Sequence, residues 1–155
     1  MDSESRRQDA RQAAGKYFKE GYNCAEAVLR AFNAELGLGL GEDALKMGSG
    51  FGGGLGHAGC VCGALAASVM VLGALQGRVD HREDREPVYR LSEEFHRRFS
   101  EAFGGTCCRA LNPHAYETRE HLRHCLKITG STAELLMGFI EEKGLPAKTR
   151  SGNAG

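Results

Sequence analysis

The stretch from Cys60 to Leu75 constrains the fold of this chain more than any other part of its sequence. Its sixteen residues carry no charge, and many of their side chains are small. A helix needs roughly 20 apolar residues to cross a bilayer, so this stretch is too short for a membrane span. We therefore expect a buried central helix whose small residues let neighbouring helices approach closely.

The rest of the chain shows helical patterns and no convincing strand. Apolar residues repeat at three- and four-residue steps from Pro87 to Phe103, which is typical of an amphipathic helix. Capping patterns mark two helix starts, at Asn23 with Glu26 and at Ser131 with Glu134. The predicted helices cover residues 3–20, 23–36, 42–46, 60–75, 87–103, a short turn after Thr106, 117–128 with a stop at Gly130, and 131–143.

Length and charge limit the classes of protein that this chain can belong to. We expect an all-α, single-domain compact bundle over residues 1–146 and a disordered tail over residues 147–155. Lys plus Arg number 20, as do Asp plus Glu, so the formal charge of zero favours neither nucleic acid nor a membrane as a partner. The polar N-terminus lacks the apolar region of a secretory signal, which predicts a cytoplasmic protein.

A glycine run precedes the apolar helix, with seven glycines between Gly50 and Leu65. The pattern G-x-G-x-x-G occurs in it twice, but a dinucleotide site also needs a strand before the run, and "GEDALKM" is not one. There is no G-K-[ST] of a P-loop. We interpret the run as a tight connection that brings the backbone close to another segment or a ligand.

The six cysteines form four clusters, and three clusters lie at predicted helix N-termini. These three are Cys24, Cys60 with Cys62, and Cys107 with Cys108. The free N–H groups and the dipole of a helix N-terminus favour a thiolate and lower its pKa. Cys125 instead lies inside a helix, one turn after His121. In a cytosolic chain this pattern indicates metal binding or redox chemistry.

None of the spacings is the C-x-x-C pair of a zinc ribbon. The pairs are C-x-C and C-C, so we expect one ligand or reactive thiol from each of the four clusters. An iron–sulfur cluster, another thiolate-bound metal and a set of thiols that form disulfides all remain open. His57, three residues before Cys60, is an additional candidate metal ligand, and His121 and His124 are weaker ones.

Four stretches of this chain resemble the C-GCAxxG-C-C family of redox-active proteins, which is named for its cysteine pattern. The resemblance spans about Ala14 to Lys143. The stretches are "GYNCAEAVLRAF", "GFGGGLGHAGCVCGALAASVMVLGAL", "FGGTCCRAL" and "HCLKIT". The glycine expected after the central motif is Ala66 or Ala67 in this chain, and two of the six cysteines are additional to the pattern.

The resemblance implies a helical fold and a redox role centred on cysteine, without a known substrate. It places the functional or metal-binding cysteines at Cys24, Cys62, Cys108 and Cys125. The other residues expected to border the cofactor or redox site are Cys60, Cys107, Gly59 and Gly63.

The leading hypothesis is a redox or electron-transfer protein that serves an unidentified partner protein. The alternative is a non-catalytic module that binds zinc or fills its core with cysteines, with the helix from Pro87 to Phe103 as a homodimer face. Residues two apart on a helix do not face each other. We therefore expect Cys62→Ser to abolish cofactor binding or redox cycling and Cys60→Ser to retain most of it, unless Cys60 lies in the turn before the helix.

Overall fold

Helices make up nearly all of the regular structure, and the all-α class is confirmed. The computed structural model describes residues 2–146, so the predicted tail over residues 147–155 lies outside the described residues. The elements are α1 (Ser3–Glu20), α2 (Cys24–Leu36), α3 (Glu42–Leu45), the 3-10 helix η1 (Lys46–Phe51), α4 (Gly52–Leu55), α5 (Gly63–Gln76), α6 (Glu86–Phe103), α7 (Cys108–Leu111) and α8 (Arg119–Glu142). Between residues 2 and 146 the only extended pairing is an isolated antiparallel bridge between Val61 and Cys107.

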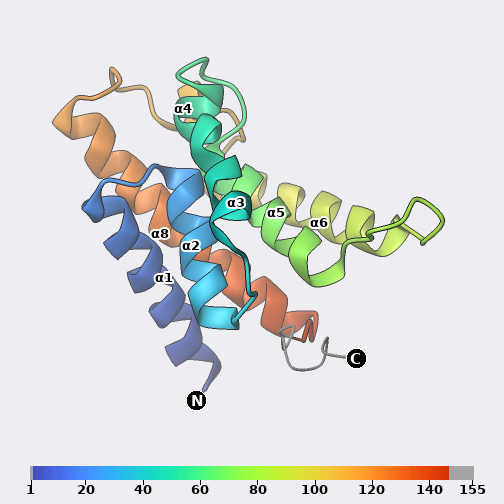
Figure 1. The fold of residues 1–155 in the computed structure, drawn as a ribbon. Coiled ribbons are helices and arrows are strands. Elements are labelled where there is room, and N and C mark those ends of the chain that lie inside the picture. The colour runs from blue at the N-terminus through green and yellow to red at the C-terminus, as the bar shows by residue number, and fades with distance from the viewer. Residues whose placement is uncertain (1, 147–155) are drawn as a thin grey trace.

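The helices divide into two groups that meet at α5. The first group consists of α1, α2 and α8, and α1 lies along α8 for much of its length (Figure 1). The helix α5 packs against both α2 and α8 and leads into α6, which extends away from the first group. The glycine run and α4 lie at one end of α2 and α8, far from the N-terminus of the chain (Figure 1).

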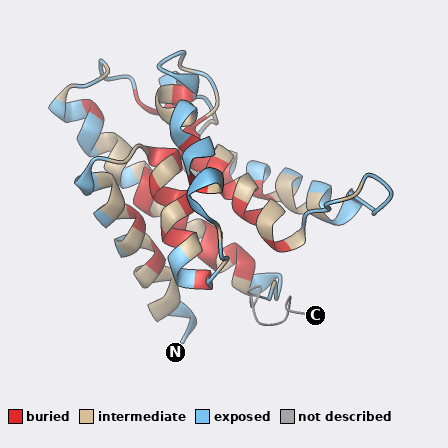
Figure 2. Cartoon of the chain, in the orientation of Figure 1, coloured by how far each residue is buried: buried red, intermediate tan, exposed pale blue. Residues whose placement is uncertain are grey.

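The predicted central helix is confirmed as the middle of the core. In α5, Val71 and Leu72 are completely buried, as are the small residues Ala64 and Ala67 (Figure 2). The buried hydroxyl of Ser68 donates a hydrogen bond to the Ala64 carbonyl at 2.8 Å, so this polar group is satisfied within the helix. Small residues on α5 thus bring its backbone close to α2 and α8 without leaving a polar group unpaired.

The prediction that Gly130 ends a helix is wrong, because α8 continues through it for 24 residues. Gly130 is buried under α1, and a Cβ there would lie 3.3 Å from the Cγ of Arg11. Glu134 pairs with Arg11 at 2.8 Å and therefore does not complete a cap with Ser131. Packing between α1 and α8 outweighs the cost of glycine inside a helix, which is about 1 kcal/mol.

Two predicted helix starts are also displaced. The helix α5 begins at Gly63 rather than at Cys60, because the backbone around Val61 pairs with the segment around Cys107. The Cys62 N–H donates to the Thr106 carbonyl at 2.8 Å, so neither segment is helical at that point. Thr106 is accordingly not the cap of α7, whose N-cap is Cys107.

The apolar face of α6 is used inside the chain. Phe95 and Phe99 are completely buried, and the Phe95 ring meets the Phe139 ring of α8 edge to face at 5.4 Å. Pro87 lies in the first turn of the helix, as predicted. No helix within residues 2–146 combines the length and the apolar character that crossing a membrane would require.

Candidate thiol site

The four cysteines of the predicted set come from four helices and gather at one end of the bundle. Cys24 is the first residue of α2, Cys62 is the N-cap of α5, and Cys108 is the first residue of α7. Cys125 lies in the second turn of α8. All six cysteines of the chain are free thiols. The chemical role of the set stays a prediction, but the helices bring its members together.

The N-terminus of α2 is fixed to the glycine run by polar contacts. The predicted capping box is confirmed: the Glu26 N–H donates to the Asn23 side chain at 2.9 Å, and the Glu26 carboxylate accepts from the Asn23 N–H at 3.0 Å. The Asn23 amide also donates to the Ser49 carbonyl at 2.9 Å. A Cβ on Gly52 would lie 2.8 Å from the same amide nitrogen, so glycine is needed for this close approach.

Two further glycines allow the thiols to approach the backbone. A Cβ on Gly63 would lie 2.6 Å from the Cys24 Sγ and 2.8 Å from the Phe51 carbonyl oxygen. Gly54 has a φ of +68°, and a Cβ there would lie 2.7 Å from the Cβ of Cys108. Side chains at these positions would push the cysteine-bearing helices apart. Gly59, also predicted to border the site, instead lies against the side chain of Arg109.

Cys24 is at the centre of the cluster. A hydrogen bond with the Cys125 thiol, followed by burial, raises the pKa of Cys24 well above its usual value. Hydrogen bonds from the backbone of Ala25 and Gly53 act in the opposite direction, as expected at a helix N-terminus, but they are weaker. The expectation that this position lowers the thiol pKa is therefore wrong for Cys24, because the neighbouring thiol and desolvation dominate.

Cys62 and Cys108 belong to the same electrostatic neighbourhood. Burial raises the pKa of Cys62 to about 12, and the nearby charges that Cys24 and Cys108 would carry as thiolates add to the rise. Burial also raises the pKa of Cys108, although a hydrogen bond from Tyr116 opposes it. The protein thus holds Cys24, Cys62 and Cys108 as neutral thiols near pH 7, contrary to the lowered pKa values that helix N-termini predict.

The two additional cysteines lie on the outside of the site. Cys60 and Cys107 are exposed, whereas Cys62 is only 6% exposed. Cys60 precedes α5, so the argument from helical spacing does not apply to it. Its carbonyl accepts a hydrogen bond from the Cys108 N–H, which makes Cys60 a backbone support of the site.

An aromatic stack, which the sequence analysis missed, covers the site. The rings of His57 and Tyr116 are parallel, with centroids 4.1 Å apart, and Tyr116 meets His121 edge to face at 4.9 Å. The Tyr116 hydroxyl donates to the Gly53 carbonyl at 3.1 Å and lies 3.9 Å from the Cys108 Sγ. Tyr116 lies in a loop without a periodic pattern, so no sequence signal identified it.

The histidines that were candidate ligands make other contacts. His121 is buried and its Nδ1 lies 3.2 Å from the His114 carbonyl oxygen, while His124 Nε2 lies 2.8 Å from the Leu111 carbonyl oxygen. Within residues 2–146, no three His, Cys, Asp or Glu side chains are arranged to hold a metal ion. The thiol interpretation is the one developed below.

An open pocket of about 970 Å³ leads to two of the thiols, Cys24 and Cys125. Its walls come from the end of α1, the glycine run and the first half of α8. Tyr22, which directly precedes the N-cap of α2, also lines it. Cys62 and Cys108 are not among the residues that line this pocket. A small molecule in the pocket would therefore meet the Cys24–Cys125 pair first.

Comparison with known proteins agrees with this cysteine pattern. The family model described as "Putative redox-active protein (C_GCAxxG_C_C)" matches residues 22–139. An uncharacterized protein of Archaeoglobus fulgidus is 29% identical over 143 residues, which cover 86% of this chain and 95% of that protein. No solved structure matches. The family match spans well over half of the chain and includes all four cysteines of the predicted set, so this protein belongs to the C_GCAxxG_C_C family of redox-active proteins.

Proposed function

We propose that this protein is a thiol–disulfide oxidoreductase in which Cys24 and Cys125 form the exchanging pair. The observation that carries the proposal is that Cys24 and Cys125 line the same open pocket as direct neighbours. Cysteines can be joined only when their Cα atoms lie within about 7 Å, and the helices α2 and α8 that carry these two thiols pack against each other.

In the proposed reaction the pair reduces a disulfide substrate. Cys125 is the more exposed thiol of the two and attacks one sulfur of the substrate as a thiolate, so that one substrate thiolate leaves. Cys24 then loses its proton and attacks the Cys125 sulfur of the mixed disulfide, releasing the second substrate thiolate. Two protein thiols become one disulfide, and the substrate disulfide becomes two thiols with the two protons.

The surroundings of Cys24 support its role as the second thiol. Its raised pKa keeps it protonated in the resting protein, so it does not compete with Cys125 for the substrate. The N–H groups of Ala25 and Gly53 stabilise negative charge on Cys24 once its proton has left. The same N–H groups make Cys24 a good leaving group when the protein disulfide is reduced again.

Cys62, which is buried, and Cys108, which is partly exposed, complete the proposed site as two further thiols next to Cys24. Each lies near enough to Cys24 for their charges to interact. The six free thiols also agree with a reducing compartment, and we propose that the protein works in the cytoplasm.

The proposal is tested by counting thiols with mass spectrometry after mild oxidation and alkylation. The wild-type protein should lose two thiols, and peptide mapping should find a bond between Cys24 and Cys125. Cys24→Ser and Cys125→Ser should each lose that bond. Cys60→Ser is the matched control, because Cys60 is exposed and outside the pocket.

Two results would contradict the proposal. Six free thiols in the wild-type protein after oxidation would exclude any exchanging pair. A Cys60→Ser variant that loses the internal disulfide as completely as Cys24→Ser would move the reactive pair to the surface.

A further inference from the structure

The pocket above the proposed pair has the size of a small-molecule site. Its volume of about 970 Å³ lies at the upper end of the range for ligand pockets, roughly 300–1,000 Å³. Phe18, Leu122 and Leu126 give it an apolar wall, and the Leu122 residue is 50% exposed. Apolar side chains that line a concave pocket can contact the organic part of a ligand.

Three cationic side chains surround the entrance, from Lys19 on α1 and from Arg119 and Arg123 on α8. All three residues are exposed, and in the part of the chain that the structure describes none of them takes part in an ion pair. Arg119 and Arg123 lie four residues apart on one helix face, where like charges destabilise the helix. The folded chain therefore gains nothing from this arrangement on its own.

The carboxylates of the pocket do not neutralise these cations. Glu26 and Glu117 are the two acidic residues in its lining. Glu26 is held at the N-terminus of α2, where it accepts hydrogen bonds from the Asn23 N–H and, at 3.1 Å, from the Ser49 hydroxyl. Glu117 is therefore the one carboxylate of the pocket lining that is left to offset three positive charges.

The positive surface continues beyond the pocket. A neighbouring groove of about 760 Å³ between α1 and α8 shares Lys19, Arg123 and Leu126 with it. The groove adds the cations Lys16 and Lys127 against one further carboxylate that is not in an ion pair with Arg11, that of Glu20. Because the two hollows share residues, an elongated ligand can place one end at Cys125 and other groups among the cations. Such a ligand would have an apolar part near its sulfur and negative charges farther from the sulfur, where the cations of the protein lie.

We infer that the pocket takes a low-molecular-mass disulfide or thiol that carries two or more anionic groups. This inference rests on the proposed function and names its substrate class. The substrate sulfur lies at Cys125, its organic part contacts Leu122 and Leu126, and its anions pair with Arg119, Arg123 and Lys19. Exchange follows the scheme above, in which the disulfide of the substrate is reduced to two thiols as Cys24 and Cys125 form a disulfide.

The test compares two disulfides that share the same carbon skeleton around the sulfurs and differ in charge and in one methyl group at each carboxyl. Reduced protein is mixed with 3,3′-dithiodipropionate, a dianion, or with its neutral dimethyl ester, and the rate of disulfide formation is followed by acid quench and alkylation. Each rate is divided by the rate at which the same disulfide oxidises a small neutral dithiol. We expect the normalised rate of the dianion to exceed that of the ester about tenfold at low salt and to approach it as salt is added.

Substitutions in the pocket sharpen the same measurement. Arg119→Gln with Arg123→Gln should reduce the ratio of the two normalised rates to about 2 or less. Arg90→Gln is the matched control, because Arg90 is exposed on α6 and is remote from the pocket, and it should keep the full ratio. Thermal unfolding of each variant shows whether it is folded.

The outcomes separate the two proposals. If the ester oxidises Cys24 and Cys125 as fast as the dianion does, the inference about charge is overturned and the exchange reaction stands. If the double variant keeps the full ratio, the cations do not select the substrate and the inference is likewise overturned. If neither disulfide oxidises the pair, the proposed function is wrong and the inference falls with it.

Discussion

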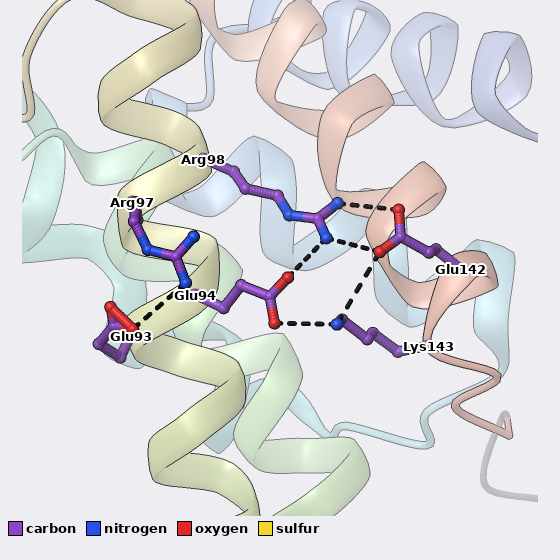
Figure 3. Close-up of polar contacts among 6 residues, drawn as sticks. All are labelled: Glu93, Glu94, Arg97, Arg98, Glu142 and Lys143. Carbon is purple, nitrogen blue, oxygen red and sulfur yellow. Dashed lines mark hydrogen bonds and ion pairs between the residues drawn. The ribbon is translucent and has the colours of Figure 1, made fainter.

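The two ends of α8 place ionisable side chains in opposite environments. Near its N-terminus, Cys125 contacts a cluster of buried thiols that burial keeps neutral. Near its C-terminus, about 25 Å farther along the helix, Glu142 belongs to a charged cluster with Arg98, Glu94 and Lys143 (Figure 3). One helix thus connects the neutral thiols of the candidate site to a cluster of oppositely charged side chains.

The charged cluster ties α6 to the end of α8. Arg98 pairs with both Glu94 on its own helix and Glu142 on α8, and Lys143 pairs with Glu94 at 2.9 Å (Figure 3). These contacts, with the hydrogen bond from Lys143 foremost, lower the pKa of Glu94, and the bond from Arg98 lowers that of Glu142. Desolvation opposes the charged forms of both glutamates, but the opposite charges around them outweigh it.

The comparison shows that burial decides which protonation state the fold stabilises. Both clusters contain several ionisable side chains within contact distance. In the charged cluster opposite charges alternate at the surface, so ionisation is favoured. In the thiol site every member is a thiol, so ionising one raises the cost of ionising the next. One end of α8 thus carries ion pairs, and the other end contacts thiols that are held neutral.

The largest expected effect is on the packing of the thiol site. Gly63→Ala places a Cβ 2.6 Å from the Cys24 Sγ and 2.8 Å from a backbone oxygen, so α2 and α5 must separate. We expect a loss of about 3 kcal/mol in the free energy of unfolding, measured by urea denaturation.

Gly130→Ala is the matched control on α8. Its Cβ would lie 3.3 Å from the flexible stem of Arg11, and alanine is the better helix former by about 1 kcal/mol, so we expect no loss of stability. Equal losses in the two variants would contradict the view that the thiol site has the tighter backbone packing.

The next effect is a loss of stability in alkaline solution. Cys62 has its folded pKa raised to about 12, above the unfolded value, so it stabilises the protein fully at neutral pH and loses this contribution as pH rises from about 8.5. We expect the free energy of unfolding of the wild-type protein to fall by about 2 kcal/mol between pH 7 and pH 10 because of this thiol. Urea denaturation under reducing conditions measures the change.

Cys62→Ala isolates the contribution of this thiol. The variant lacks the group that ionises, so the difference in stability between it and the wild-type protein should narrow by about 2 kcal/mol over the same pH range. Parallel pH profiles for the two proteins would show that Cys62 is not buried as a neutral thiol.

The smallest expected effect is at the charged end. Arg98→Met removes the pairs with Glu94 and Glu142 but keeps an apolar stem against the Phe139 ring. We expect the Tm to fall by about 2 °C at low salt and by less at high salt, since exposed pairs contribute little and are screened.

The loss of stability at acidic pH provides a further way to distinguish the charged end of α8 from the thiol end. The lowered pKa values of Glu94 and Glu142 give stability that is present above their unfolded values and is lost as pH falls through the folded ones. Arg98→Met should therefore be less sensitive to acid than the wild-type protein. A variant whose Tm depends on salt and acid as strongly as the wild type does would show that the cluster contributes nothing.

Much of the helical architecture followed from local sequence patterns. The capping box at Asn23 and Glu26 and the periodic apolar residues of α6 act over a few residues, so they are readable without the fold. The uncharged stretch of α5 predicted burial, because exposing so many apolar side chains to water is unfavourable. The predicted helix end at Gly130 was wrong, because the role of this glycine depends on its contact with α1. A glycine can end a helix or let another helix approach, and the local sequence does not distinguish the two.

The site divides in the same way. The sequence by itself determined that cysteines lie at the starts of α2, α5 and α7, since caps and glycines are local signals. Only the tertiary structure decided that Cys24 meets Cys125 and that their surroundings raise the pKa of Cys24 instead of lowering it. Desolvation and contact between thiols depend on residues about a hundred positions apart in the chain, and no local pattern encodes such distances.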